Sequence, residues 1–291
     1  MPLIMIDVGG TVLNYLEKGE GPTVIFVHGV AGDYRIWKEI ADPLSKHFRT
    51  IAYSRRCSNP NQNRDVQNST VENNVKDLEG LVEKSGGGPV VLVGHAYGGA
   101  ISALYTAKRP ERVSSIVLME PFMPSLLSRN PRSMHNLSMM LTKPSVARSA
   151  SRWMKSMEAI GSDLDAKEGG KAVEKYLDDI CTQEEEKRSY PKKAKEMMVL
   201  NAQTIREADT ARPPFTKKDA KTIAQPTLLI QGEHSPKASL AMVGILHKAM
   251  PNNQVATVKG SAHLLPVEKP GECLALIDNF LKERKGKGQL T

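Results

Sequence analysis

The clearest chemical signature in the chain begins at Val90, where an apolar run enters a glycine-bracketed turn followed by a helical pattern. The residues are Val90-Val91-Leu92-Val93-Gly94-His95-Ala96-Tyr97-Gly98-Gly99-Ala100. A nucleophile elbow of this form lifts its central side chain above a sheet, and the next backbone N–H points toward a developing oxyanion. Gly94 and Gly98 would relieve crowding in the turn. The spacing therefore indicates nucleophilic chemistry centred on position 96.

The residue at the centre of this elbow is Ala96. A methyl group cannot attack a carbonyl carbon, so the chain lacks the hydroxyl that such a turn usually displays. A deliberate serine-to-alanine exchange would account for this, and we then expect Ser at position 96 in the native enzyme. A natural protein without catalysis, or one with a histidine-driven reaction, is the alternative.

A histidine near the end of the chain is the candidate general base. His263 follows the last expected strand and stands among small residues, which leave an imidazole free to lean into a cleft. An imidazole that moves protons needs a carboxylate to hold its tautomer. Glu120 ends a buried apolar run, at the edge of a parallel sheet where ligands bind. We therefore expect Glu120 to orient His263.

These residues require a sheet whose strands end side by side. The first half of the chain alternates short apolar runs with amphipathic stretches, which is typical of strands joined by crossover helices, and the alternation returns after residue 222. The expected strands span residues 3–8, 12–17, 23–28, 49–54, 90–93, 113–119, 227–231 and 254–259. The expected helices span residues 34–46, 70–84, 97–108, 239–249 and 270–285.

The middle of the chain follows a different pattern. Residues 124–221 contain no convincing β-branched run; Met, Ala, Lys and Glu dominate, and prolines divide the segment into helix-length pieces. We interpret residues 124–221 as an inserted helical cap. Residues 1–123 and 222–291 then form one α/β core.

With these motifs established, the chain resembles the α/β-hydrolase superfamily, in its capped esterase, lipase and haloalkane-dehalogenase-like branch. The likeness rests on the pair His28-Gly29 after a strand, the elbow at 94–99, and His263. It implies an α/β-hydrolase fold, with a mostly parallel, doubly wound sheet, an inserted helical cap, and a site between them. It also implies a serine hydrolase that cleaves an ester-like bond of a small hydrophobic substrate through an acyl-enzyme, with Ala96 at the nucleophile position. Aspartate at that position marks dehalogenases and epoxide hydrolases.

The acid is where the chain departs from the usual family pattern. Ser235 stands at the position after the seventh strand where Asp is usual. Some hydrolases, including certain haloalkane dehalogenases, carry the acid after the sixth strand instead, which matches Glu120. Glu233 is the fallback, followed by Asp33. Glu120 could also simply cap the entry to the helical insertion.

The resemblance also predicts the residues around the reacting bond. The backbone N–H groups of Val30 and Tyr97 would form the oxyanion hole. The expected substrate contacts are His28, Gly29, Trp37, Arg55, Met123, Trp153 and Leu264. Of these, His28 is interpreted as structural rather than proton-transferring, and His95 is expected to pack. Arg55 or Arg56 could bind a substrate carboxylate, but solvated loop arginines or a salt bridge to the cap are the favoured explanation.

Several methionines fall in the predicted cap. They could line an adaptable apolar pocket or take part in ordinary packing. They are Met139, Met140, Met154, Met157, Met197 and Met198.

Composition narrows the remaining function classes. Of 291 residues, 40 % are hydrophobic and 25 % charged, which excludes intrinsic disorder. The net charge of +8 comes from residues 125–221, with 19 Lys/Arg against 14 Asp/Glu, and from 282–287, with 4 against 1. No aromatic-interleaved basic motif accompanies it, so we expect no nucleic-acid partner. The chain lacks an apolar run of ~20 residues and a secretory signal, so we expect a cytoplasmic protein without a membrane partner.

The cysteines predict neither a disulfide framework nor a zinc cluster, because Cys57, Cys181 and Cys273 are odd in number and far apart. We expect no metal and no organic cofactor, and a small molecule as the substrate. Two other functions stay open. The first is a cofactor-free lyase or oxygenase in which His263 and Glu120 abstract a substrate proton; the second is a small-molecule receptor without catalysis.

Overall fold

The centre of the molecule is a mixed, mostly parallel sheet. The computed structural model describes residues 2–63, 65–86, 88–128, 140–181, 190–210 and 212–290. Within them, eight strands are ordered β1-β2-β4-β3-β5-β6-β7-β8; the pairs β1–β2 and β2–β4 are antiparallel, and the others are parallel. The strands are β1 (Ile4–Asp7), β2 (Val12–Lys18), β3 (Thr23–Val27), β4 (Arg49–Tyr53), β5 (Val90–His95), β6 (Val113–Met119), β7 (Thr227–Gly232) and β8 (Asn253–Val258).

All eight expected strands are present, with bounds that shift by at most two residues. The central strand β5 is buried along its whole length. A parallel strand covered by helices on both faces needs a continuous apolar run, and Val90 to Val93 supply one. This confirms the predicted doubly wound sheet.

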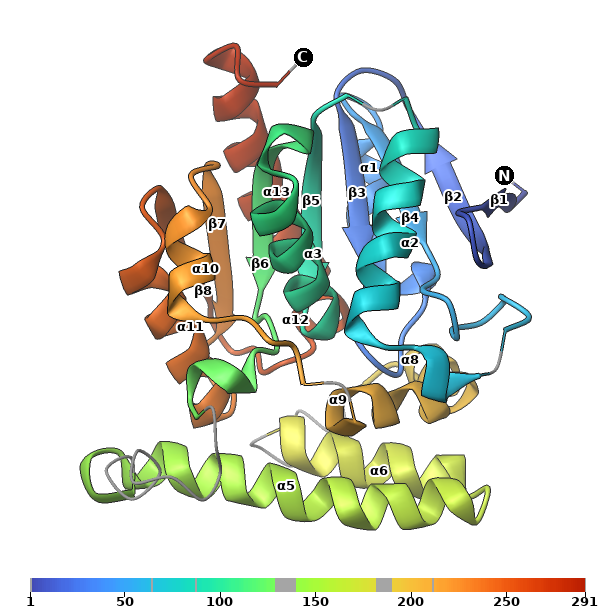
Figure 1. The fold of residues 1–291 in the computed structure, drawn as a ribbon, viewed down its shortest axis with the longest axis vertical. Coiled ribbons are helices and arrows are strands. Elements are labelled where there is room, and N and C mark those ends of the chain that lie inside the picture. The colour runs from blue at the N-terminus through green and yellow to red at the C-terminus, as the bar shows by residue number, and fades with distance from the viewer. Residues whose placement is uncertain are drawn as a thin grey trace.

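Helices cover both faces of the sheet (Figure 1). On one face α1 (Lys38–Leu44) contacts α13 (Pro270–Gly286). On the other face, α2 (Val71–Lys84), α3 (Tyr97–Lys108), α10 (Lys217–Thr222) and α11 (Lys237–Ala249) form a contiguous row. The short elements are η1 (Tyr34–Trp37), η2 (Val66–Asn68), η3 (Pro110–Arg112), η4 (Pro124–Leu126), η5 (Ala202–Ile205) and α12 (Leu265–Glu268).

Four further helices lie between β6 and α10 in the described part of the chain: α5 (Pro144–Asp165), α6 (Gly169–Ile180), α8 (Lys192–Leu200) and α9 (Arg206–Thr210). Figure 1 shows α5 and α6 side by side along one end of the sheet. The long helix α5 buries only Met157, Ile160 and Leu164, which recur at helical spacing and form one apolar stripe. The segment α10 falls inside the predicted cap range of 124–221, yet it packs against α3 and α11 of the core. No helix in the described ranges is long and apolar enough to cross a membrane.

A buried ion pair joins the core to these helices. Arg55, in the loop after β4, pairs with Glu207 of α9, and both residues are only 1 % exposed. Ser69 Oγ donates a hydrogen bond to the Glu207 carboxylate at 2.7 Å, and Arg55 Nη1 donates to Asn74 Oδ1 at 3.1 Å. Because every charge here has hydrogen-bonded partners, the pair fixes α9 against the core.

Removing the acid of this pair should destabilise the protein. We expect Glu207→Gln to lower the free energy of unfolding by about 3 kcal/mol, because Arg55 would stay buried without its counter-charge. Urea unfolding followed by circular dichroism measures the loss. Glu283→Gln is the control, since Glu283 pairs with Lys287 on the exposed end of α13 and should change stability little. A loss at Glu207 no larger than the control's would contradict the assignment.

Candidate active site

The turn between β5 and α3 has the strained backbone of a nucleophile elbow. Ala96 adopts φ 49° and ψ −117°, an unusual conformation for a residue with a Cβ atom. Two backbone hydrogen bonds hold it: Ala96 N donates to Met119 O at 3.0 Å, and Phe122 N donates to Ala96 O at 2.9 Å. Position 96 is therefore fixed by the neighbouring strand β6 and the residues that follow it.

The glycines around the elbow are required by close packing. A Cβ atom on Gly98 would lie 2.1 Å from Val27 O, and one on Gly94 would lie 2.6 Å from Ser102 Oγ. Glycine at these two positions lets α3 begin directly above the sheet. The strand, sharp turn and helix that the motif predicts are all present.

His263 and Glu120 lie in direct contact. The Nδ1 atom of His263 is 2.7 Å from Glu120 Oε2, and the two residues are 7 % and 1 % exposed. Because a carboxylate only accepts hydrogen bonds, Nδ1 carries a proton, and the neutral tautomer that this favours has its lone pair on Nε2. The other oxygen of Glu120 accepts hydrogen bonds from Gly232 N, at 2.7 Å, and from Ser235 Oγ. Glu120 is thus fixed at both oxygens and can hold one tautomer of His263.

The two other candidate acids have different partners. Glu233 accepts a hydrogen bond from Gly260 N at 3.0 Å. Asp33 accepts from Arg35 and from Asn201 Nδ2, the latter at 2.8 Å. Ser235, which stands at the usual acid position, donates to Glu120 instead. The carboxylate that touches the imidazole therefore comes from the end of β6.

Glu268 of α12 shapes the loop that carries His263. Its carboxylate accepts hydrogen bonds from Ser261 Oγ at 2.6 Å, from Leu264 N at 3.0 Å, and from Ala262 N. Residues on both sides of His263 are thereby tied to one side chain. Nothing in the sequence motif singled out Glu268, because the contact forms only when α12 folds back on the loop.

His95 connects the elbow strand to the same loop. Its Nε2 atom is 2.8 Å from the backbone oxygen of His263, and the two imidazole rings are 5.2 Å apart. Burial, and then the neighbouring charge of His263, lower the pKa of His95 to about 3. His95 is therefore neutral, donates through Nε2, and ties the loop of His263 to the residue before Ala96. This is the packing role expected for it.

Two backbone N–H groups near position 96 are available to an anion. Within the described residues, neither Val30 N nor Tyr97 N donates to an acceptor. Tyr97 begins α3, so the helix dipole adds to the attraction of its N–H. The loop of Val30 is close: a Cβ atom on Gly29 would lie 3.1 Å from Ala96 Cβ. These are the two groups expected to form an oxyanion hole.

His28 stabilises this loop from below. Its Nδ1 donates to Gly29 O at 2.7 Å, and Arg55 N donates to its Nε2 at 2.9 Å. Burial, and then the charge of Arg55, hold the pKa of His28 well below its usual range. Both ring nitrogens are occupied, so His28 shapes the oxyanion loop, as expected, and has no nitrogen left for a substrate.

Arg55 and Arg56 are placed differently from the expected substrate contact. The Arg55 guanidinium lies 5.0 Å above the Tyr97 ring and binds Glu207. Arg56 forms a two-point ion pair with Asp77, at 2.7 and 2.8 Å. Neither arginine lines the cavity described next. Each charge is buried and already neutralised, so the substrate contact expected for Arg55 is corrected to the favoured alternative, a salt bridge to the predicted cap.

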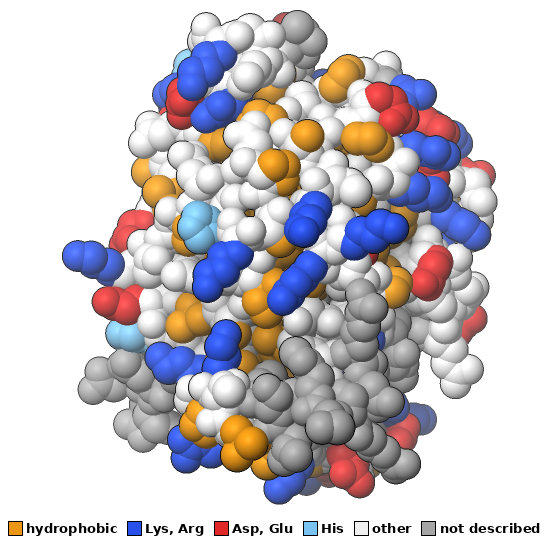
Figure 2. All heavy atoms as spheres, turned by 60° about the vertical axis from the view of Figure 1, so that its left-hand side comes forward, with side chains coloured by type: hydrophobic (Ala, Val, Ile, Leu, Met, Phe, Trp, Pro, Cys, Tyr) orange, Lys and Arg blue, Asp and Glu red, His pale blue; other side chains and the backbone are white. Residues whose placement is uncertain are grey.

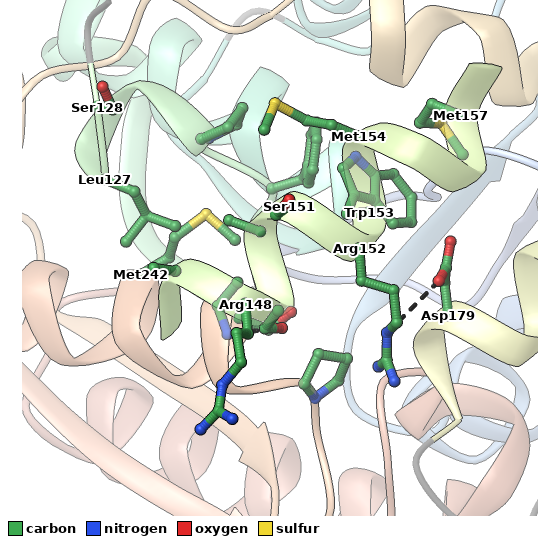
Figure 3. A pocket seen from close by; sticks show the side chains of 18 of the residues that line it. Leu127, Ser128, Arg148, Ser151, Arg152, Trp153, Met154, Met157, Asp179 and Met242 are labelled. Atoms are coloured by element: carbon green, nitrogen blue, oxygen red, sulfur yellow. Dashed lines mark hydrogen bonds and ion pairs between the residues drawn. The ribbon is translucent and has the colours of Figure 1, made fainter. Parts of the chain in front are cut away.

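A cavity of about 430 Å³ reaches His263. Its walls come from α5 and α6, the residues after β6, and the start of α11, and most of them are apolar (Figure 3). Trp153 lies in one wall, where its ring centroid is 5.6 Å from that of Phe122. The expected methionines Met140, Met154 and Met157 also line it. The volume suits a small organic molecule.

Other expected contact residues lie outside this cavity. Trp37 is fully buried and packs on Phe26, with 5.2 Å between ring centroids. The remaining ones are buried in the core or cap and do not line it: Gly29, Met123, Leu264, Met197 and Met198. Met139 lies outside the described residues. Ala96 is 3 % exposed and is not a lining residue either. The cavity thus meets the site at His263.

The sequence motifs missed several lining residues. They are Phe122, Met242 and Pro236 from the core, and Arg148, Arg152, Asp179 and Arg212 from the predicted cap. No local signal marks them, because they face the cavity only through the packing of α5 and α6 over the sheet. Among the side chains described, no three His, Cys, Asp or Glu residues are arranged to hold a metal ion.

Comparisons with known proteins identify the family of the fold. Residues 22–270 match the family model described as alpha/beta hydrolase fold. The 2-(acetamidomethylene)succinate hydrolase of Mesorhizobium japonicum is 25 % identical, over 95 % of this chain and 94 % of that protein. Epoxide hydrolase 3 of Xenopus tropicalis is 24 % identical, over 94 % and 76 %.

A solved structure shows the same arrangement of the chain. The thermophilic esterase from Thermogutta terrifontis (malate bound) has a TM-score of 0.71 at 21 % identity, covering 97 % of this chain and 99 % of that one. At this identity the likeness concerns the fold. Since the family model spans most of the sequence and the elbow, sheet and helices fit it, the chain belongs to the α/β-hydrolase-fold family.

Proposed function

We propose that this site is built to hydrolyse an ester-like bond in a small, largely hydrophobic substrate, with position 96 as the nucleophile position. His263 would move the proton, Glu120 would orient His263, and the N–H groups of Val30 and Tyr97 would receive the oxyanion. The observation that carries the proposal is the hydrogen bond from His263 Nδ1 to Glu120 Oε2. In the neutral imidazole it leaves the lone pair of Nε2 available, as a general base requires.

The reaction would run in two halves when serine occupies position 96. The hydroxyl oxygen attacks the substrate carbonyl while its proton passes to His263 Nε2, and the carbonyl oxygen becomes an anion between the two N–H groups. The leaving alkoxide takes the proton from His263. Water then repeats the sequence on the acyl-enzyme and releases the acid, with the proton again passing through His263.

With Ala96 in place, the first half cannot occur. No side chain at the elbow can form the acyl bond, so this chain should bind the substrate but scarcely turn it over. The rest of the machinery is intact in geometry: the elbow stays strained, and the carboxylate stays hydrogen-bonded at both oxygens.

A second candidate function follows from the same pair. His263 and Glu120 are assembled although position 96 carries no hydroxyl. A lyase or oxygenase that begins by removing a substrate proton needs only the base and its carboxylate, and no acyl intermediate. A receptor that keeps the cavity for binding is the non-catalytic alternative.

Covalent labelling separates these functions. We expect a fluorophosphonate to add to the introduced serine of the Ala96→Ser variant, detected by mass spectrometry, and to leave the parent chain unlabelled. The same variant with His263→Ala is the control and should label far more slowly. Failure to label the introduced serine in a folded variant would argue against the hydrolase proposal and favour proton abstraction or binding alone.

A further inference from the structure

Positive charge is concentrated in the walls of the cavity that reaches His263. Arg148, Arg152 and Arg212 line it together with one acidic residue, Asp179. The remaining lining residues are mostly apolar or small. All three arginines are exposed to solvent, so their guanidinium groups border the cavity where an anion from solution can reach them.

A second hollow adjoins the first on its arginine side. Arg148, Ser149, Arg152 and Pro236 line both, and the second also includes Lys237 and His234. The face of the molecule shown in Figure 2 carries Lys and Arg side chains across its middle, where acidic side chains are sparse. The two hollows are therefore lined by more cations than acids, the acids being Asp179 and Glu233, and an excess of positive charge attracts anions from solution.

The acids near these arginines leave positive charge uncompensated. Arg152 Nε lies 3.7 Å from Asp179 Oδ1, which is longer than a charge-assisted hydrogen bond. Within the described part of the chain, Arg148 has no acidic partner. Glu233, at the edge of the second hollow, already accepts a hydrogen bond from Gly260 N. The guanidinium of Arg148 is thus free to bind an anion.

The spacing of Arg148 and Arg152 suits a carboxylate. The two residues are four positions apart on α5, so their side chains leave the same face of the helix. Figure 3 shows both projecting to one side of α5. Planar guanidinium groups bind carboxylates through paired hydrogen bonds, which fixes the orientation of the bound molecule.

We propose that the substrate carries a carboxylate, which Arg148 and Arg152 bind while its reacting bond lies at His263. The inference rests on the proposed function and deepens it by naming the substrate class: an ester-like compound with a free acid group at the other end of an apolar chain. The methionines and Trp153 would cover that apolar part. Arg148 and Arg152 are then specificity-determining residues on the cap.

Binding to the chain with Ala96 tests the inference without any need for turnover. Monomethyl adipate and dimethyl adipate are probes of similar length that differ in one negative charge. We expect calorimetry to show tighter binding of the monoester by about tenfold or more, the value of one charge-assisted hydrogen bond. Equal affinities for the two probes would overturn the inference.

Variants identify the residues responsible. Arg148→Gln and Arg152→Gln should each weaken monoester binding about tenfold and leave diester binding unchanged. Lys155→Gln is the matched control, because Lys155 is an exposed cation on the same helix that lines neither hollow. A monoester preference that survives both arginine changes, or that falls equally in the control, would place the carboxylate elsewhere and overturn the assignment.

Failure of the carboxylate site and failure of the hydrolase proposal give different results. In the Ala96→Ser variant, ester turnover without any preference for the monoester would support the hydrolase and reject the carboxylate site. Arginine-dependent monoester binding without turnover or labelling would retain the carboxylate site and reject the hydrolase.

Discussion

The Ala96→Ser variant should hydrolyse p-nitrophenyl butyrate at least about a thousandfold faster than the parent chain. A nucleophile and its base act as a unit, so a chain without the nucleophile loses several orders of magnitude in kcat, and restoring it should recover them. The structure favours this gain. Ala96 already has the strained elbow backbone, and Val30 N and Tyr97 N have no competing acceptor among the described residues. The hydroxyl oxygen of the introduced serine would add the nucleophile to the proposed base, acid and oxyanion-binding N–H groups.

Release of p-nitrophenolate, followed by absorbance, measures the rate. Ala96→Gly is the control, since it alters the same position without adding a hydroxyl and should stay at the parent rate. Equal activity of the alanine and serine chains would show that the reaction needs no acyl-enzyme, and would leave proton abstraction by His263 as the better explanation.

In the Ala96→Ser background, Glu120→Gln should lower kcat by about ten-thousandfold. The Glu120 carboxylate accepts a hydrogen bond from His263 Nδ1 and would stabilise the imidazolium that the proposed attack would form. A glutamine amide can present its NH₂ group to Nδ1 instead. The imidazole would then carry its proton on Nε2 and could not act as a base.

Two further variants make this result specific. Glu233→Gln should leave kcat nearly unchanged, because Glu233 binds Gly260 N rather than His263. Ser235→Ala should give a smaller loss than Glu120→Gln, since it removes one of the hydrogen bonds that hold the carboxylate and leaves the one from Gly232 N. A larger loss at Glu233 than at Glu120 would reverse the assignment of the acid.

Local sequence was sufficient for the sheet and the elbow. Strand bounds follow from apolar runs, which must be continuous where helices cover both faces of a parallel sheet. The elbow requires glycines because its close contacts leave no room for a Cβ atom at these positions. The pairing of Glu120 with His263 was predicted from their places after strands, because the carboxyl ends of parallel strands meet at one edge, together with the family resemblance. Glu233 and Asp33 stayed open as alternatives.

Local sequence patterns did not predict contacts between residues that lie far apart in the chain. Arg55 is the clearest case: its partner Glu207 is 152 residues away, so the sequence left both a substrate contact and a salt bridge to the cap open, and the structure shows the salt bridge. Ser235 likewise gains its role only because β7 lies beside β6, which brings its hydroxyl to Glu120.

The amino-acid pattern was enough to predict the class of fold and the elbow, since these depend on residues within or directly after single strands. It left several candidate acids for His263, and the contact with Glu120 and the residues that line the cavity are known only from the folded arrangement. Arg148 and Arg152 lie on a helix whose own pattern says no more than which face is apolar. Many weak contacts from separate segments determine the position of that helix over the sheet, so no short sequence motif predicts it.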